Sequence, residues 1–133
     1  EEPGWSADVR ATWAERRGQT LPNDVGEDRF SYLKPMLGLS DGVSSRPAAI
    51  VHHSDKGYFA IRKGNWVLLD CHGSGGWTLE EKDALDLPPL QLYNIREDIT
   101  EQKNLADKFP DITSELHGIL KRYISDGRSR DSK

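Results

Sequence analysis

The sequence predicts an α+β fold: a four-stranded antiparallel sheet packed against a C-terminal amphipathic helix, with an N-terminal helix and long loops. Short alternating apolar runs separated by turn residues fill residues 48–70, a pattern typical of an antiparallel meander. A further run follows Pro88 and Pro89, and a helical apolar stripe occupies 112–124. A meander exposes one apolar face, and an amphipathic helix is the simplest element to cover it.

The N-terminal third predicts one helix followed by loops. Ser6 is a suitable N-cap for a helix that ends at about Arg17, because its side-chain oxygen can accept a hydrogen bond from the first turn. The apolar stripe of this helix is thin, so we expect it to dock through Trp5 and Trp13 on another surface. Residues 18–47 are mostly loop-like, rich in Gly, Pro, Asn, Asp and Ser.

The middle of the chain predicts the sheet. Four short runs carry β-branched or aromatic residues between turn residues. The expected strands are residues 48–53, 58–62, 66–70 and 90–95. The first two turns are short and each contains a glycine, whereas residues 71–88 form a longer excursion before the fourth strand.

The last third predicts two helices. A short helix is expected over 101–108 with Thr100 as its N-cap, and a second begins at Pro110, a residue favoured at the first helical position. Gly127 closes the second helix. The expected division is residues 1–47 as helix and connecting loops, 48–127 as a sheet-and-helix subdomain, and 128–133 as a disordered tail.

Composition excludes several classes of protein. The net charge is -4, with 18 basic and 22 acidic residues mixed along the chain, so no positive field for nucleic acid is predicted. One cysteine excludes an internal disulfide framework. No apolar run reaches membrane-spanning length. The chain begins with Glu1 rather than Met, which we interpret as a piece of a longer protein.

Two segments carry the candidate chemistry. His52-His53-Ser54 ends the first strand, where neighbouring side chains point to opposite faces; a histidine can bind an anion when protonated or form a hydrogen bond when neutral. The other segment is the glycine-rich loop Cys71 to Trp77. It lacks the glycine that a nucleophile elbow needs two positions before Ser74, because His72 stands there. A structural role is the simpler interpretation of both segments.

An ordered series of motifs resembles the formylglycine-dependent sulfatases of the alkaline-phosphatase-like superfamily. The most specific part runs from His52-His53-Ser54 through Gly57-Tyr58-Phe59-Ala60-Ile61-Arg62 and Gly64 to Trp66-Val67-Leu68. Sulfatases commonly show Gly-x-x-Ala-Ile-Arg, then Gly, then Trp-Lys-Leu in this hairpin. The other matching segments are 8–12, 21–33, 73–77, 92–95 and 104–106. The chain thus resembles the C-terminal subdomain of a sulfatase.

The resemblance implies a parent enzyme, a sulfuric ester hydrolase, whose N-terminal catalytic domain is the partner of this subdomain. Calcium and a formylglycine nucleophile are implied for that parent, and its substrate is a sulfated sugar or aryl sulfate. Cys71 lacks the Pro and Arg of the Cys/Ser-x-Pro-x-Arg motif and is not the nucleophile. We therefore expect a fragment that is inactive alone, without catalytic or metal residues, from a periplasmic, secreted or otherwise exported parent.

By the same resemblance, this subdomain lies beside the active-site mouth and helps to select the substrate. The implied substrate-binding residues are His53, His52, Ser54 and Trp77. Two other functions remain open. A non-enzymatic carbohydrate-binding module would use the tryptophans and histidines, and a protein-interaction domain would use the polar N-terminal helix.

Overall fold

The computed structural model describes residues 8–22, 25, 28–39, 49–75 and 81–129. The chain divides into two compact units, Ala48–Ser125 and Glu1–Pro47 with Asp126–Lys133. The first of these holds the sheet and most of the long helix. Among the described residues, no helix is both long and apolar enough to cross a membrane.

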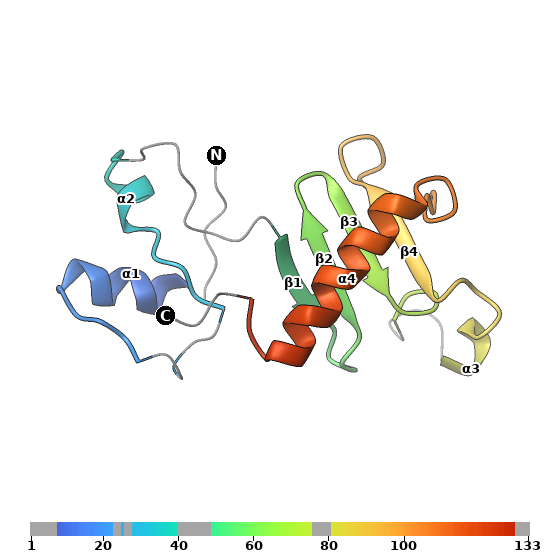
Figure 1. Ribbon diagram of the computed structural model, residues 1–133. Coiled ribbons are helices and arrows are strands. Elements are labelled where there is room, and N and C mark those ends of the chain that lie inside the picture. Colours follow the sequence, from blue (N-terminus) through green and yellow to red (C-terminus); the bar gives the residue numbers. More distant parts are fainter. Residues whose placement is uncertain (1–7, 23–24, 26–27, 40–48, 76–80, 130–133) are drawn as a thin grey trace. The chain divides into compact units, whose positions relative to one another are not determined.

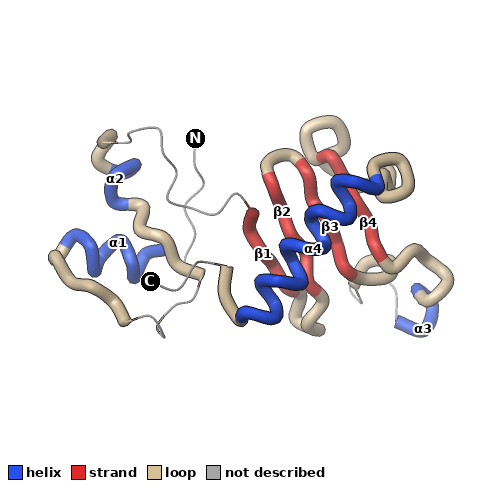
Figure 2. The backbone as a smooth tube through the Cα atoms, in the orientation of Figure 1, coloured by secondary structure: helices blue, strands red, loops and turns tan. Residues whose placement is uncertain are grey.

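The sheet is an antiparallel meander in the order β1-β2-β3-β4 (Figures 1 and 2). Its strands are β1 (Ala49–His53), β2 (Phe59–Lys63), β3 (Trp66–Asp70) and β4 (Leu90–Asn94). Gly57 and Gly64 close the first two turns with φ of 84° and 61°, a left-handed conformation in which a residue with a β-carbon is strained. The four predicted strands are therefore confirmed, each within one residue at either end.

The core lies between one face of the sheet and helix α4 (Pro110–Asp126), which runs across the strands (Figure 1). The register aligns Val51, Ile61, Leu68 and Leu92 across the four strands. The buried core cluster consists of Ala49, Ile61, Leu68, Leu92, Leu116 and Leu120. Because the last two belong to α4, the predicted α+β fold with a covering helix is confirmed.

Polar contacts at the edges of this core connect α4 to the sheet. Lys63 on β2 forms an ion pair with Glu115. Asp70 at the end of β3 lies 3.4 Å from Nε2 of His117. Both pairs connect α4 with the sheet and lie outside the apolar cluster.

The helix predicted over 101–108 is wrong, because the structure has turns there. Asn104 Oδ1 accepts hydrogen bonds from the backbone N–H of Leu92 (3.0 Å) and of Ala106 (2.9 Å). Leu105 N–H donates to the Leu92 carbonyl at 2.8 Å. The outer edge of β4 thus supplies the hydrogen bonds that a helix would otherwise make within itself.

The N-terminal unit contains α1 (Asp8–Arg16) and α2 (Leu33–Met36). Asp8 is 2% exposed, and its carboxylate accepts the Phe30 N–H at 2.9 Å. Thr12 Oγ1 accepts the Tyr32 N–H at 2.9 Å, so residues 30–32 are fixed beside α1. The predicted α1 is confirmed, although its expected cap Ser6 lies outside the described residues.

The chain also contains a short helix before β4 and a described stretch of the tail. Helix α3 (Glu81–Ala84) lies in the excursion for which the sequence predicted no element. Of the predicted tail, the structure describes Arg128 and Ser129, and the Ser129 N–H donates to the Asp28 carboxylate at 2.7 Å.

Candidate functional site

The candidate site begins at the turn between β1 and β2. The Ser54 N–H donates to the Tyr58 carbonyl at 2.8 Å, and the Gly57 N–H donates to the Ser54 carbonyl at 3.0 Å. Ser54 Oγ accepts the Tyr58 N–H at 3.2 Å. The Ser54 hydroxyl therefore accepts one hydrogen bond within the turn, and its O–H can donate to a ligand.

His53 is exposed and lies on the same face of the sheet as α4. Its ring packs edge-on against Phe59, with centroids 6.0 Å apart. Nδ1 lies 2.9 Å from the Ser54 carbonyl oxygen, and because a carbonyl can only accept, Nδ1 carries the proton. This tautomer leaves Nε2 to accept a hydrogen bond when the ring is neutral and to donate to an anion when it is protonated.

His52 lies on the opposite face, where it is paired in register with Ala60. Desolvation of its ring against the sheet, followed by the positive charge of Arg62, lowers the pKa of His52 although the residue as a whole is exposed. Both effects disfavour the imidazolium. The two histidines therefore present different chemistry to different faces, as the strand alternation predicts, and the structure does not bring them to one ligand.

Residues 71–75 form the second part of the candidate site, and Gln91 fixes their backbone. Its Nε2 donates to the carbonyls of Cys71 (2.9 Å) and Gly73 (2.7 Å). Tyr93 Oη in turn donates to Gln91 Oε1 at 2.7 Å. His72 Nδ1 donates to the Leu87 carbonyl at 2.6 Å. The described part of this loop is thus held by side-chain hydrogen bonds from β4 and by the segment before it.

Burial of the Cys71 thiol and the nearby Asp70 carboxylate raise the pKa of Cys71. A raised pKa keeps the sulfur as the unreactive thiol. The Cys71 side chain also limits Gly75, since a β-carbon there would lie 3.3 Å from the sulfur. Cys71 therefore acts as a packing residue of the loop rather than as a nucleophile.

Tyr58 connects the two parts of the site. A β-carbon at Gly75 would lie 3.6 Å from Cδ2 of Tyr58, which follows the His53–Ser54 turn. Phe59 and Asp70 are paired in register, so the turn and the loop leave the same end of the sheet. Trp77, the remaining predicted substrate-binding residue, lies outside the described residues.

The described residues do not suit a metal ion. Within this part of the chain, no group of three or more His, Cys, Asp or Glu side chains is placed to hold one. Calcium prefers six to eight oxygen ligands, including carboxylates. No described residue is therefore assigned to the calcium ion that the sequence resemblance implies for the parent.

Gln91, Tyr93 and Tyr58 were not predicted as site residues. The alternation of the strand around Gln91 places it on the same face as Tyr93. However, the Gln91 amide donates to carbonyls 18 and 20 positions earlier in the chain. Those contacts depend on the β3–β4 register and on the path of the loop. A local sequence pattern carries no signal for either.

No protein-family model matches the chain. In sequence it is 32% identical over 116 residues to an N-acetylgalactosamine-6-O-sulfatase of Bacteroides thetaiotaomicron. The match covers 85% of this chain and 22% of that relative. The chain thus corresponds to less than a quarter of the length of the relative.

Solved structures show the same fold. One comes from a study of the metabolism of multiple glycosaminoglycans by Bacteroides thetaiotaomicron; its TM-score is 0.66 at 27% identity, over 86% of this chain and 24% of that one. A 2-O glycosaminoglycan sulfatase has a TM-score of 0.61 at 21% identity, and the match covers 90% of this chain and 24% of that one. A third protein, in complex with its substrate D-glucosamine-2-N,6-O-disulfate, has a TM-score of 0.62 at 17% identity. This match covers 94% of this chain and 25% of that one. These likenesses confirm the resemblance predicted from the sequence motifs.

Proposed function

We propose that this chain, which is similar to the C-terminal region of sulfatases, completes the fold of a sulfatase and helps to shape its substrate site. The observation that carries the proposal is the 32% identity to a sulfatase over 85% of the chain. The confirmed meander and covering helix support it, because they are the fold that the resemblance implies. Hydrolysis of the sulfate ester then belongs to the parent enzyme and its catalytic domain.

Calcium and formylglycine are part of this proposal, and both would reside in the catalytic domain. Cys71 is buried in an unreactive setting, and the described residues do not fit a calcium site. We propose in addition that the parent is exported, either to the periplasm or to the exterior. The chain alone is then inactive towards sulfate esters.

His53 is the residue that we propose for contact with the substrate. It is exposed, its orientation is fixed by Phe59 and the Ser54 carbonyl, and its Nε2 is available to a ligand. Ser54 offers one O–H beside it. The 71–75 loop starts at the same end of the sheet and leads to Trp77, whose ring would suit stacking against a sugar. His52 contributes less, because it faces the other side of the sheet.

A chimeric enzyme tests this function. The matching region of the N-acetylgalactosamine-6-O-sulfatase is deleted in one variant and replaced by this chain in another. We expect the deletion to abolish hydrolysis and the replacement to restore it in part, while the pure chain hydrolyses no 4-nitrophenyl sulfate. Turnover by the pure chain would contradict the proposal that it is inactive alone. A folded chimera no more active than the deletion would contradict the proposal that it completes the enzyme.

The role of His53 is tested in the same chimera. Loss of one hydrogen bond to a charged group costs about 1.5–3 kcal/mol, so we expect His53→Leu, which keeps bulk against Phe59 but forms no hydrogen bond, to raise KM by about tenfold or more. The control is Lys121→Gln, which removes a charge from an exposed position of α4. Equal kinetics in the two variants would exclude contact between His53 and the substrate.

A further inference from the structure

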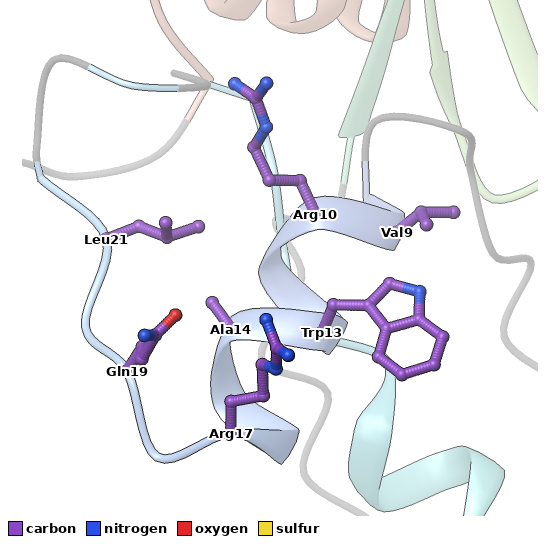
Figure 3. Close-up of a pocket in the computed structure, with 7 residues that line it drawn as sticks. All are labelled: Val9, Arg10, Trp13, Ala14, Arg17, Gln19 and Leu21. Atoms are coloured by element: carbon purple, nitrogen blue, oxygen red, sulfur yellow. The ribbon is translucent and has the colours of Figure 1, made fainter.

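The surface along α1 is an open hollow rather than a ligand site (Figure 3). The Arg10 and Arg17 side chains extend from opposite ends of it, so their guanidinium groups do not converge on one position. Trp13 lines the same surface and is 59% exposed. A set of polar groups that does converge lies in the other unit, around Gln91 on β4.

The Gln91 side chain uses both ends of its amide. Its Nε2 donates to the carbonyls of Cys71 at 2.9 Å and Gly73 at 2.7 Å, and its Oε1 accepts the Tyr93 hydroxyl at 2.7 Å. A primary amide provides two N–H donors and one acceptor oxygen, so glutamine matches all three partners. A carboxylate of the same shape would only accept, and it would face two carbonyl oxygens.

Tyr93 fixes the direction in which this amide points. Tyr93 is 6% exposed, and because its hydroxyl donates to Oε1, the Nε2 of Gln91 is turned towards the loop. Burial of the Tyr93 ring, together with the carboxylates of Glu101 and Asp98, raises the pKa of Tyr93. The phenol therefore stays protonated and remains a donor. The orientation of Gln91 thus comes from a buried residue of the same strand.

The loop that Gln91 holds packs against the residue that precedes β2. Gly75 is buried, and a β-carbon there would lie 3.6 Å from Cδ2 of Tyr58. The Tyr58 carbonyl accepts the Ser54 N–H at 2.8 Å, and the Tyr58 N–H donates to Ser54 Oγ at 3.2 Å. A continuous series of contacts therefore runs from Gln91 through residues 71–75 and Tyr58 to the turn at Ser54.

This series of contacts lies outside the apolar core. The described residues 71–75 contribute no member to the core cluster, and the hydrogen bonds of Gln91 go to the backbone of the loop. The network therefore fixes the position of the loop relative to the turn, whereas the packing of α4 on the sheet fixes the fold.

We infer that Gln91 is a positioning residue for the substrate site, because it sets how the 71–75 loop stands against the turn that carries His53 and Ser54. It acts through the loop backbone and needs no contact with the substrate. Groups that bind a substrate must be held within fractions of an ångström by the residues behind them. The inference rests on the proposed function, which places the substrate at this turn.

Amide hydrogen exchange of the intact chain tests whether Gln91 holds the loop. In Gln91→Glu, we expect the Gly75 amide to exchange at least about tenfold faster, while the Ile61 amide in the centre of the sheet keeps its rate. The matched control is Gln19→Glu, the same chemical change at an exposed position of the N-terminal unit. Equal exchange of the Gly75 amide in Gln91→Glu and in the control would overturn the inference.

The chimera tests whether this position matters to the substrate. With N-acetylgalactosamine 6-O-sulfate, we expect Gln91→Glu to raise KM about five- to tenfold and to change kcat by less than about twofold. A purely structural role predicts the opposite pattern, because loss of folded enzyme lowers kcat and leaves KM unchanged. The Gln19→Glu chimera should match the unmodified chimera in both constants.

Tyr93→Phe provides a milder second variant. It keeps the buried ring and removes only the hydroxyl that orients the Gln91 amide, so Gly75 exchange and KM should both rise by about twofold or more. If Gln91→Glu does not fold, Tyr93→Phe decides both measurements.

The kinetic result separates this inference from the proposed function. An active chimera in which Gln91→Glu leaves KM unchanged would overturn the role of Gln91 and keep the proposed function. An unmodified chimera without activity would overturn the proposed function, and the role of Gln91 at the substrate site would fall with it.

Discussion

His52 and His53 are neighbours in the chain, but the pleat of β1 places them in different surroundings. His53 is oriented by Phe59 and by the Ser54 carbonyl on the α4 face. His52 faces the other side, where desolvation and Arg62 lower its pKa. The alternation of a strand predicts this separation from two adjacent letters of sequence. The identity of each ring's neighbours follows only from the register with β2.

The lowered pKa of His52 makes stability depend on pH. In the unfolded chain the ring has its usual pKa near 6.5, so as the pH falls below about 7 the unfolded state takes up a proton before the folded state does. Stability is therefore lost as the pH falls through the unfolded pKa towards the lower folded pKa. Urea unfolding at pH 7.5 and pH 5 should show a larger loss in the unmodified chain than in His52→Gln.

Arg62→Gln provides the matched comparison for this prediction. Removing the guanidinium takes away one of the two causes of the lowered pKa, so the loss of stability between pH 7.5 and pH 5 should shrink without disappearing. An identical pH dependence in all three proteins would show that His52 titrates alike in the folded and unfolded states.

At the scale of elements, α4 holds the sheet-and-helix unit together. Leu116 and Leu120 are 1% and 0% exposed and pack on Ile61, Leu68 and Leu92. Replacing a buried leucine by alanine removes apolar contacts and leaves a cavity, at a cost of about 2–5 kcal/mol. We expect Leu120→Ala to lower the free energy of unfolding by that amount in urea titrations. Ile124→Ala is the control, because Ile124 is 43% exposed on the same helix and should cost clearly less.

The strands and α4 could be predicted because their signals are local. Alternating apolar residues bounded by glycine turns define β2 and β3, and the stripe on α4 matches the helical period. The same reasoning predicted a helix over 101–108, where the structure has turns. Thr100 was expected to cap a helix, but its hydroxyl donates to the Asp98 carboxylate (3.2 Å), which also accepts the Lys103 N–H (2.8 Å). A segment whose hydrogen bonds go to a distant strand gives no periodic signal of its own.

At the scale of the whole molecule, the two units differ in how their apolar residues are used. The buried cluster lies entirely within Ala48–Ser125. The described residues of the N-terminal unit contribute nothing to this cluster. Both units leave large apolar side chains exposed: Val9, Trp13, Met36, Leu37 and Leu39 in the N-terminal unit, and Leu85, Leu87, Ile99 and Ile124 in the other. Exposed apolar surface of this kind is typical of an interface with other protein.

This difference predicts that the sheet-and-helix unit folds by itself. A shortened chain of residues 48–127 keeps all six members of the core cluster, so we expect a cooperative thermal transition and well-dispersed amide resonances. Residues 1–47 alone should show neither. A shortened chain 48–127 that unfolds without cooperativity would show that its stability depends on the N-terminal unit.

The contacts of Asn104 also affect how the protein behaves at high concentration. Exposed strand edges recruit strands from other molecules and so start aggregation. On β4, the N–H and carbonyl of Leu92 are already taken by Asn104 and Leu105, and the Leu90 carbonyl accepts from the Asn104 amide at 3.2 Å. The Asn104 side chain and the Leu105 N–H together therefore take the place of a fifth strand along Leu90 to Leu92 and block intermolecular pairing there.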